Sequence, residues 1–212
     1  MTIVPLPAGP FEIVYADPAW FYQDRREGGN GTRFGGGCVN HYPVMSVEEI
    51  CALPVYQIAA EDAWLFLWAT WPTLPDALRV ISAWGFKFST LAFNWIKTNR
   101  KNGEPFFGIG HATKSNSEPC LLARRGSPRV ASNYVSQIAE CGEAFETEDI
   151  RSPRREHSRK PDEVRDRIVQ LCGDRPRIEL FARQAVEGWS AWGNEVPAEE
   201  CVNRAKEAPA DV

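Results

Sequence analysis

The feature that most constrains the fold of this chain is a short apolar run that stops at Asp17-Pro18-Ala19-Trp20. Residues 11–16 read FEIVYA, the pattern of a buried strand, and Pro18 ends it because proline lacks the backbone N–H that a sheet requires. A carboxylate, a rigid turn and a large aromatic ring therefore follow the carboxyl end of a strand. Ligands of open α/β sheets bind at this edge, so the tetrapeptide is the first candidate site.

Further segments have the apolar pattern of strands. They are expected at residues 64–69, 86–97, 119–123 and 177–182, with a closing turn or strand at 189–196. The run at 64–69 is apolar throughout, which is typical of a strand that is covered on both faces.

Helical patterns separate these strands. Helices are expected at residues 46–53, 74–85, 161–173 and, as a short segment, 135–138. Ser46 opens the first with a capping box, and Leu78, Ile81 and Trp84 form the buried side of the second. Pro161 takes the first helical position of the third.

Strands that alternate with helices predict a doubly wound α/β sheet. We expect one domain over residues 1–196, followed by a polar tail at 197–212. The segments 21–45, 98–118 and 125–157 are expected to be loops that face the substrate, because long Gly-rich or charged excursions from a small domain usually carry function.

The composition favours a globular cytoplasmic protein. The chain has 212 residues, of which 43% are hydrophobic, and no stretch approaches the roughly 20 apolar residues of a membrane span. Its six cysteines are widely spaced and are expected to be reduced thiols. Neither His111 nor His157 has the spacing of a metal-ligand set, so no metal is expected.

Charge is distributed unevenly along the chain. The net charge is -4, yet residues 97–129 carry seven basic side chains against two acidic ones, and residues 151–160 carry five against one. This polarisation predicts a local basic face for phosphates on an acidic body, although solvated loops would produce the same pattern.

Several segments together resemble the DPPW-type family of N6-adenine methyltransferases, which includes the catalytic subunit of the eukaryotic mRNA adenosine methyltransferase. The chain is most similar to the small phage and bacterial members. The resemblance rests on DPAW (17–20), HYPVMS (41–46), LFLW (65–68), WIKTN (95–99), SRKPDE (158–163), ELFAR (179–183) and WGN (192–194). These segments run in the family order from about residue 11 to 196.

The resemblance implies a Rossmann-like fold in permuted order, with the catalytic strand before the cofactor strand, and S-adenosylmethionine as cofactor. The residues that match cofactor-binding positions are Ser158, Lys160, Glu179, Phe181, Arg183, Asn194 and Glu195. Lys160 is expected to pair with the methionine carboxylate. Glu195 stands where relatives often have glutamine, and Val186 replaces a polar position of some relatives.

The chemistry assigns roles to the tetrapeptide. The N6 lone pair of adenine is delocalised into the ring, so an enzyme gains by holding the amine in line with the sulfonium methyl. We expect the Asp17 carboxylate and the Pro18 carbonyl to accept the two N–H bonds, with Trp20 stacked on the extruded base. Ala19 replaces the second proline of the family, so the turn loses one fixed φ angle.

Adenine N6 in DNA, with single-stranded DNA as one option, is the expected substrate, and the side chains expected to contact it are Tyr42, Lys97, Arg154 and Arg155. Two alternatives stay open at this point. One is an RNA adenosine N6-methyltransferase, and the other is a non-catalytic nucleic-acid-binding partner of a methyltransferase heterodimer. A homodimer is a further candidate assembly.

Overall fold

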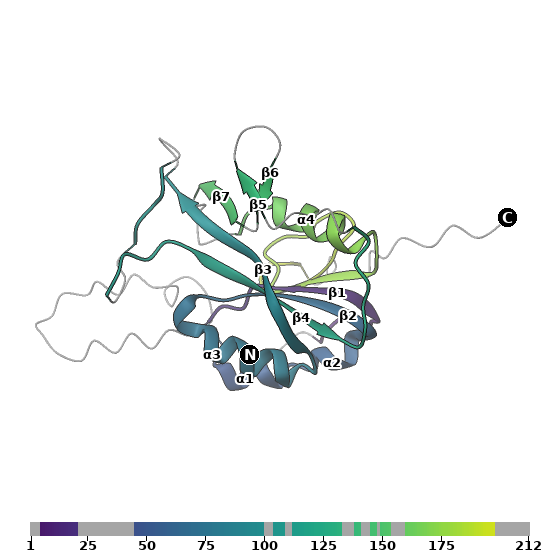
Figure 1. Ribbon diagram of the computed structural model, residues 1–212. Helices are drawn as coiled ribbons and strands as arrows, with labels where there is room; N and C mark the ends of the chain where they lie inside the picture. Colours follow the sequence, from purple (N-terminus) through teal and green to yellow (C-terminus); the bar gives the residue numbers. More distant parts are fainter. Residues whose placement is uncertain are drawn as a thin grey trace, which may run out of the picture.

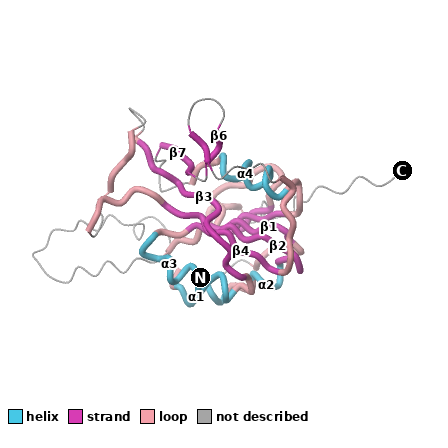
Figure 2. Tube along the Cα trace, in the orientation of Figure 1, coloured by secondary structure: helices cyan, strands magenta, loops and turns pink. Residues whose placement is uncertain are grey.

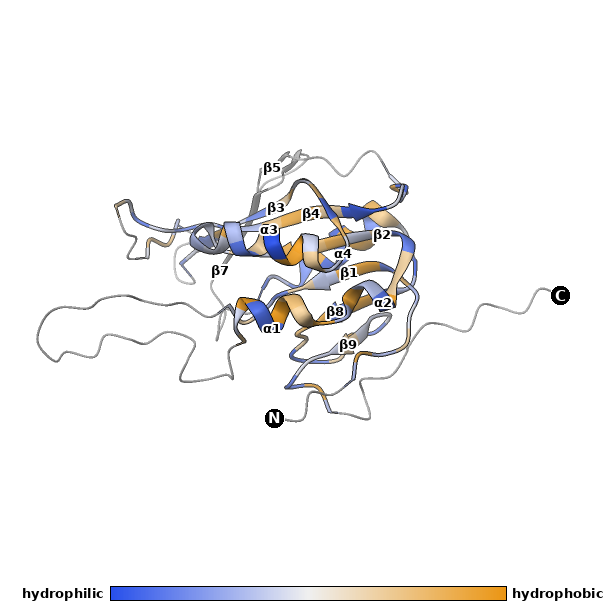
Figure 3. Cartoon of the chain, turned by 90° about the horizontal axis from the view of Figure 1, so that it is seen from below, coloured by the Kyte–Doolittle hydropathy of each residue, from blue (hydrophilic) through white to orange (hydrophobic). Residues whose placement is uncertain are grey.

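A computed structural model describes residues 5–20, 45–99, 104–108, 112–132, 138–140, 145–147, 149–153 and 160–197. Its main sheet contains β1 (Phe11–Ala16), β2 (Ala59–Trp68), β3 (Lys87–Thr98), β4 (Glu118–Arg125), β7 (Asp149–Pro153), β8 (Arg177–Leu180) and β9 (Ser190–Trp192). The seven strands are ordered β7-β3-β4-β2-β1-β8-β9. Figure 1 labels β1 to β4 and β7 among them, and Figure 3 labels β8 and β9. A separate two-stranded sheet pairs β5 (Ile138–Glu140) with β6 (Phe145–Thr147).

Strand direction decides which residues meet. β1 runs parallel to β2 and β8, β8 parallel to β9, and β3 parallel to β7. β4 runs antiparallel to both of its neighbours, β2 and β3. The carboxyl ends of the parallel strands and the amino end of β4 therefore lie at one edge of the sheet, which we call the carboxyl edge; the opposite edge is the amino edge.

Helices cover both faces of the sheet. α1 (Val47–Ala52), α2 (Val55–Ile58), the 3-10 turn η2 (Trp71–Thr73) and α3 (Leu74–Ala83) lie on one face (Figures 1 and 3). α4 (Glu163–Cys172) covers the other face (Figure 2). Because side chains alternate along a strand, Leu65 and Leu67 of β2 pack in the first core cluster, while Phe66 and Trp68 pack in the second.

The residues that cap the helices were partly predictable from the sequence. The capping box is confirmed: the Ser46 hydroxyl accepts a hydrogen bond from the Glu49 backbone N–H at 3.2 Å, and the Glu49 carboxylate accepts one from the Ser46 N–H at 2.7 Å. The expected start of the last helix is wrong, because α4 begins at Glu163 with Asp162 as N-cap, and Pro161 lies outside it. Gly173 ends α4 with φ 86°, as predicted.

The expected buried side of α3 needs one correction. Leu78 is 37% exposed, whereas Ala77, Val80 and Ile81 are buried. The prediction for Ile81 and Trp84 is confirmed, and only Leu78 is wrong, because Ala77 takes its place in the stripe that faces the sheet.

Strands extend further than their apolar runs. β2 starts at Ala59 and β4 covers Glu118–Arg125, because pairing with neighbours carries the backbone through polar residues at both ends. Ile138 lies in a strand, not in the expected short helix; residues 135–137 fall outside the described residues. No helix in the described part of the chain is long and apolar enough to cross a membrane.

Candidate active site

Asp17 leaves the carboxyl end of β1 and points its carboxylate at Lys160. The Lys160 Nζ lies 2.8 Å from Oδ1 and 3.0 Å from Oδ2 of Asp17. The two side chains are only 20% and 12% exposed, so the pair lies in a largely desolvated place. Lys160 precedes α4, and the structure thereby joins the two segments that the sequence identified as catalytic and cofactor-binding.

Glu118 completes a row of alternating charges at the carboxyl edge. Its Oε2 lies 3.3 Å from the Lys160 Nζ, and its Oε1 lies 2.5 Å from the Lys97 Nζ. We call Asp17, Lys160, Glu118 and Lys97 the charge row. Sequence analysis missed Glu118, and the signal was an acidic residue directly before the apolar run 119–123. Only the antiparallel direction of β4 brings the start of this strand to the carboxyl edge.

Aromatic rings form the floor beneath Lys160. The Lys160 Nζ lies 5.4 Å from the ring centroid of Trp68 at the end of β2. The Trp68 indole N–H donates to the Tyr15 hydroxyl at 2.7 Å. Both rings are buried, and burial raises the pKa of Tyr15 well above its ordinary value, so the phenol stays neutral. These neutral, buried rings lower the local dielectric constant, which strengthens the attraction between Lys160 and the carboxylates.

Two members of the charge row, Lys160 and Glu118, stay ionised at neutral pH. Burial by itself lowers the pKa of Lys160, but the carboxylates of Asp17 and Glu118 outweigh it and raise the pKa. Burial raises the pKa of Glu118, and the ammonium groups of Lys160 and Lys97 outweigh it, so the net shift is downward. Two carboxylates and two ammonium groups therefore balance within one site.

The turn after Asp17 is held by its own backbone and by Trp20. The Trp20 N–H donates to the Pro18 carbonyl at 2.9 Å, which leaves that oxygen one further lone pair to accept with. The Trp20 indole N–H donates to the Trp68 carbonyl at 3.1 Å, and the residue is 5% exposed. A ring buried in the core offers no open face, so base stacking by Trp20 does not fit this placement. Ala19 is half-buried.

Two of the segments that match the family, ELFAR (179–183) and WGN (192–194), meet where β8 and β9 end. Phe181 has φ 63°, a rare conformation for a side-chain-bearing residue, and packs edge-on against Trp192 with centroids 5.5 Å apart. A Cβ placed on Gly193 would lie 2.1 Å from the Ala182 carbonyl oxygen, so only glycine permits this approach.

The side chains that leave these two turns are polar. Arg183 and Glu195 approach to 3.9 Å, both partly exposed, and Asn194 is exposed beside them. A guanidinium, a carboxylate and an amide together offer donors and acceptors for ribose hydroxyls and an adenine edge. The expected partner of the methionine carboxylate, Lys160, is here already paired with Asp17 and Glu118.

Glu179 has a different role from the expected one. Its carboxylate receives two hydrogen bonds from Arg165 of α4, at 2.7 and 2.9 Å, and its side chain is 9% exposed. Asp162 accepts a third hydrogen bond from the same guanidinium at 3.0 Å. Glu179 therefore fastens α4 to β8 and, in this arrangement, is not open to a cofactor.

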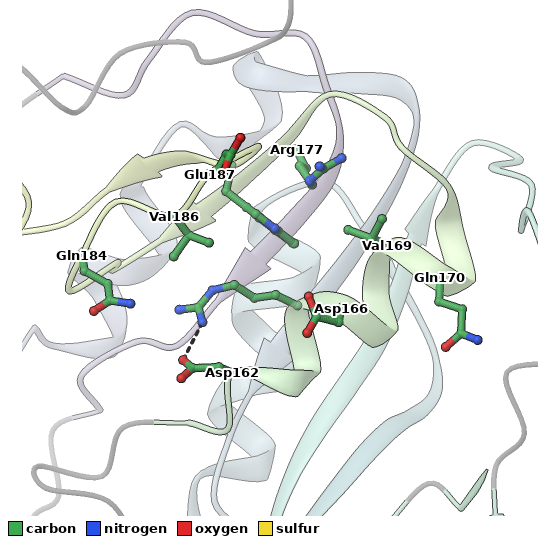
Figure 4. Close-up of a pocket in the computed structure, with 10 residues that line it drawn as sticks. Asp162, Asp166, Val169, Gln170, Arg177, Gln184, Val186 and Glu187 are labelled. Atoms are coloured by element: carbon green, nitrogen blue, oxygen red, sulfur yellow. Dashed lines mark hydrogen bonds and ion pairs between the residues drawn. The ribbon is translucent and has the colours of Figure 1, made fainter.

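A hollow of about 540 Å³ lies between α4 and the segment that joins β8 to β9 (Figure 4). Figure 4 shows Asp162 and Asp166 on the helix side, with Gln184, Val186 and Glu187 on the other. None of the charge row lines it. The hollow follows from the β8–β9 connection, which contains no helix to cover this part of the sheet.

Several predicted residues cannot be placed. Tyr42, Arg154, Arg155 and Ser158 lie outside the described residues. In the part of the chain that the structure describes, no cluster of three or more His, Cys, Asp or Glu side chains could hold a metal ion, and Cys51, Cys120 and Cys172 are free thiols.

The predicted basic face over residues 97–129 is wrong as a single surface. Lys97 lies at the carboxyl edge, but β4 carries Arg124 and Arg125 to the amino edge. Arg125 donates there to the backbone carbonyls of Tyr56, at 2.6 Å, and Ala59, at 3.3 Å. The antiparallel strand therefore divides the basic residues between two opposite edges.

The sequence of this chain is similar to those of known methyltransferases. The MT-A70 family model matches residues 11–195. The chain is 31% identical to the type II methyltransferase M.MunI of Mycoplasma sp, over 91% of this chain and 80% of that protein. It is 28% identical to the N(6)-adenosine-methyltransferase MT-A70-like of Arabidopsis thaliana and 24% identical to the N(6)-adenine-specific methyltransferase METTL4 of Homo sapiens.

Coverage differs among these relatives. The alignments cover 92% and 88% of this chain but only 25% of the Arabidopsis protein and 37% of the human one. The family match itself spans residues 11–195 and includes Asp17, Glu118 and Lys160. The chain therefore belongs to the MT-A70 family and is an S-adenosylmethionine-dependent N6-adenine methyltransferase.

Proposed function

We propose that this chain methylates adenine N6 in DNA. The observation that carries the choice of DNA is the similarity to a type II methyltransferase over 80% of that protein, since type II methyltransferases modify DNA. The relatives named for adenosine or RNA share a much smaller part of their length, such as 25% and 47%. RNA is the second candidate substrate because these matches still cover about nine-tenths of this chain, 92% and 88%.

In the proposed mechanism, Asp17 and Pro18 accept hydrogen bonds from the adenine amine. S-Adenosylmethionine, when bound, supplies an electrophilic methyl group. A carboxylate offers about four lone-pair directions, so Asp17 can accept an N–H from adenine while Lys160 holds both of its oxygens in place. The Pro18 carbonyl supplies the second acceptor. Together they fix the direction of the amine lone pair, which is the costly part of aligning a weak nucleophile.

Glu118 is proposed as a positioning residue. It touches Lys160 and Lys97 but not Asp17 itself, so its effect on the amine passes through the Lys160 ammonium. Without this second carboxylate, Lys160 would be free to move away from the line between Asp17 and Glu118. The preorganised arrangement matters because fixed charges stabilise a transition state without reorganising during the reaction.

The remaining proposals concern cofactor and architecture. We propose that Arg183, Asn194 and Glu195 hold the nucleoside part of the cofactor, supported by the close approach of Gly193 to Ala182. The strand order, with β1 before β8, is consistent with a permuted Rossmann-like methyltransferase of one domain over residues 1–196. A homodimer stays a proposal as well.

The test compares Asp17→Asn with wild type in single-turnover methylation of matched DNA and RNA oligonucleotides, with N6-methyladenine identified in the product. Asparagine preserves the shape but loses the charge, and we expect a rate lower by about 10²-fold or more. Glu12→Gln is the matched control, because Glu12 lies on the same strand near the amino edge and pairs with Arg175 at 2.8 Å.

Three outcomes of this assay would contradict the proposal. Wild-type rates in Asp17→Asn would reject the role of Asp17. Faster transfer to RNA than to DNA of the same sequence would select the RNA candidate. Oligonucleotide binding without any methyl transfer by the wild-type chain would select the non-catalytic partner.

A further inference from the structure

Four aromatic side chains are strongly exposed among the described residues, and they divide between the two edges of the sheet. Trp71 is 50% exposed and Phe107 is 58% exposed. Trp71 follows the carboxyl end of β2, and Phe107 lies in the connection that leaves β3 and returns as β4, so both lie at the carboxyl edge. Tyr56 and Phe88, 50% and 44% exposed, lie at the amino edge. Single exposed aromatics are common, so only their surroundings can indicate a role.

Trp71 follows the strand that lies between the two strands bearing Asp17 and Glu118 at their ends. β2 is flanked by β1, which leads into Asp17, and by β4, which begins at Glu118. The indole N–H of Trp71 donates to the Ser117 hydroxyl at 3.0 Å, and Ser117 directly precedes Glu118. The polar atom of the ring is therefore satisfied by the protein, and half of the Trp71 side chain is exposed at the edge of the sheet where β4 begins.

The local backbone holds this ring in place. Trp71 opens η2, in which the Thr73 hydroxyl accepts a hydrogen bond from the Thr70 N–H at 3.0 Å, and Pro72 fixes the next φ angle. Ser117, the partner of the Trp71 indole, is held in place by its neighbour Asn116. The Asn116 side chain accepts a hydrogen bond from the Lys97 backbone N–H at 3.0 Å and donates one to the Lys97 carbonyl at 2.9 Å. A rigid aromatic ring costs little entropy when a ligand stacks on it.

One cationic group accompanies one of the two exposed rings at the carboxyl edge. The Lys114 Nζ lies 5.9 Å from the ring centroid of Phe107, on the same β3–β4 connection as Ser117. The described part of this connection extends beyond the sheet (Figure 1). Aromatic faces that take bases, combined with cations that take phosphates, are the recurring elements of single-stranded nucleic-acid binding.

We propose that Trp71 stacks on the nucleobase next to the adenine that is methylated. The proposal rests on the proposed function, because it requires an adenine held at Asp17. The ring is half-exposed at the rim and not enclosed, which suits a flanking base better than the target, whose amine must reach the desolvated carboxylate. Trp20 is buried and cannot stack on a base. Trp71 can, and the base on which it stacks is the neighbour of the target adenine.

The test measures KM and kcat of Trp71→Ala, Trp71→Phe and Phe88→Ala on single-stranded oligonucleotides containing one adenine. One set has ordinary bases on both sides of the adenine, and the other has abasic residues there. With ordinary flanks, Trp71→Ala is expected to raise KM about tenfold and to leave kcat within about twofold, since one stacked base is worth about a factor of ten. Trp71→Phe is expected to restore most of the loss, and Phe88→Ala to match wild type.

The abasic substrate decides which base is stacked. The KM of wild type should rise about tenfold when the flanking bases are removed, the same increase that Trp71→Ala shows with ordinary flanks. The KM of Trp71→Ala should not rise further on the abasic substrate. Additive losses, or an unchanged KM in Trp71→Ala, would overturn the proposal while methylation by wild type still upholds the proposed function. Absence of methylation by wild type on every substrate would instead overturn both.

Discussion

Replacing Glu118 by glutamine tests whether the charge row is one coupled unit. Glutamine keeps the shape of the side chain and removes the charge that Lys97 and Lys160 share at 2.5 and 3.3 Å. The three side chains are between 11% and 19% exposed, so the loss resembles the breaking of a buried pair, about 3–5 kcal/mol. Lys160 keeps Asp17, so we expect the lower end, about 3 kcal/mol of unfolding free energy.

Urea denaturation at pH 7 measures this loss. With a slope of about 2 kcal/mol per molar urea, a loss of about 3 kcal/mol lowers the midpoint by about 1.5 M. The matched control is Glu48→Gln, which removes the exposed pair between Glu48 and Arg79, with side chains 73% and 58% exposed. Screening by solvent makes such a pair nearly neutral, so the control should unfold with wild-type protein.

The pH dependence of the free energy of unfolding tests the contribution of Glu118 independently. The flanking lysines hold the pKa of Glu118 below its ordinary value of 4.5. A carboxylate with a depressed folded pKa contributes stability that is complete above pH 4.5 and is lost as the pH falls through the folded value. The difference between wild type and Glu118→Gln should therefore shrink below pH 4.5. A wild-type urea midpoint for Glu118→Gln at pH 7 would refute the coupling.

Two further substitutions test the cofactor turn and the core. Gly193→Ala places a Cβ 2.1 Å from the Ala182 oxygen, so we expect S-adenosylmethionine affinity to fall about tenfold or more by calorimetry; Gly108→Ala, whose nearest contact is 3.4 Å, should bind normally. Trp20→Ala should lower the free energy of unfolding by about 3–5 kcal/mol in urea, because the ring is 5% exposed. Unchanged affinity in the first variant, or unchanged stability in the second, would contradict these assignments.

Local chemistry made much of the fold predictable. The Ser46 capping box, the Gly173 helix end and the strand that leads into Asp17 all appear where the sequence indicates them. These features depend on neighbours within a few residues, so a short window of sequence contains their cause. The family motifs likewise identified Asp17 and Lys160, which the structure brings together.

Strand direction was not predictable from the same windows. An apolar run such as 119–123 reads identically in a parallel and an antiparallel strand. The sequence therefore did not indicate that Glu118 reaches the site, and it grouped Arg124 and Arg125 with Lys97 in one basic face. Burial was the other limit, because the motif alone does not reveal that Trp20 faces the core and Trp71 faces outward.

The antiparallel β4 explains why these corrections belong together. One reversed strand brings Glu118 and Ser117 to the carboxyl edge, and these two neighbours bind Lys160 and the Trp71 indole respectively. The same reversal removes Arg124 and Arg125 from that edge, so fewer cations compete for Asp17. A site that must hold an uncharged amine beside a carboxylate needs this balance, because each unpaired cation nearby would attract the carboxylate away from the base.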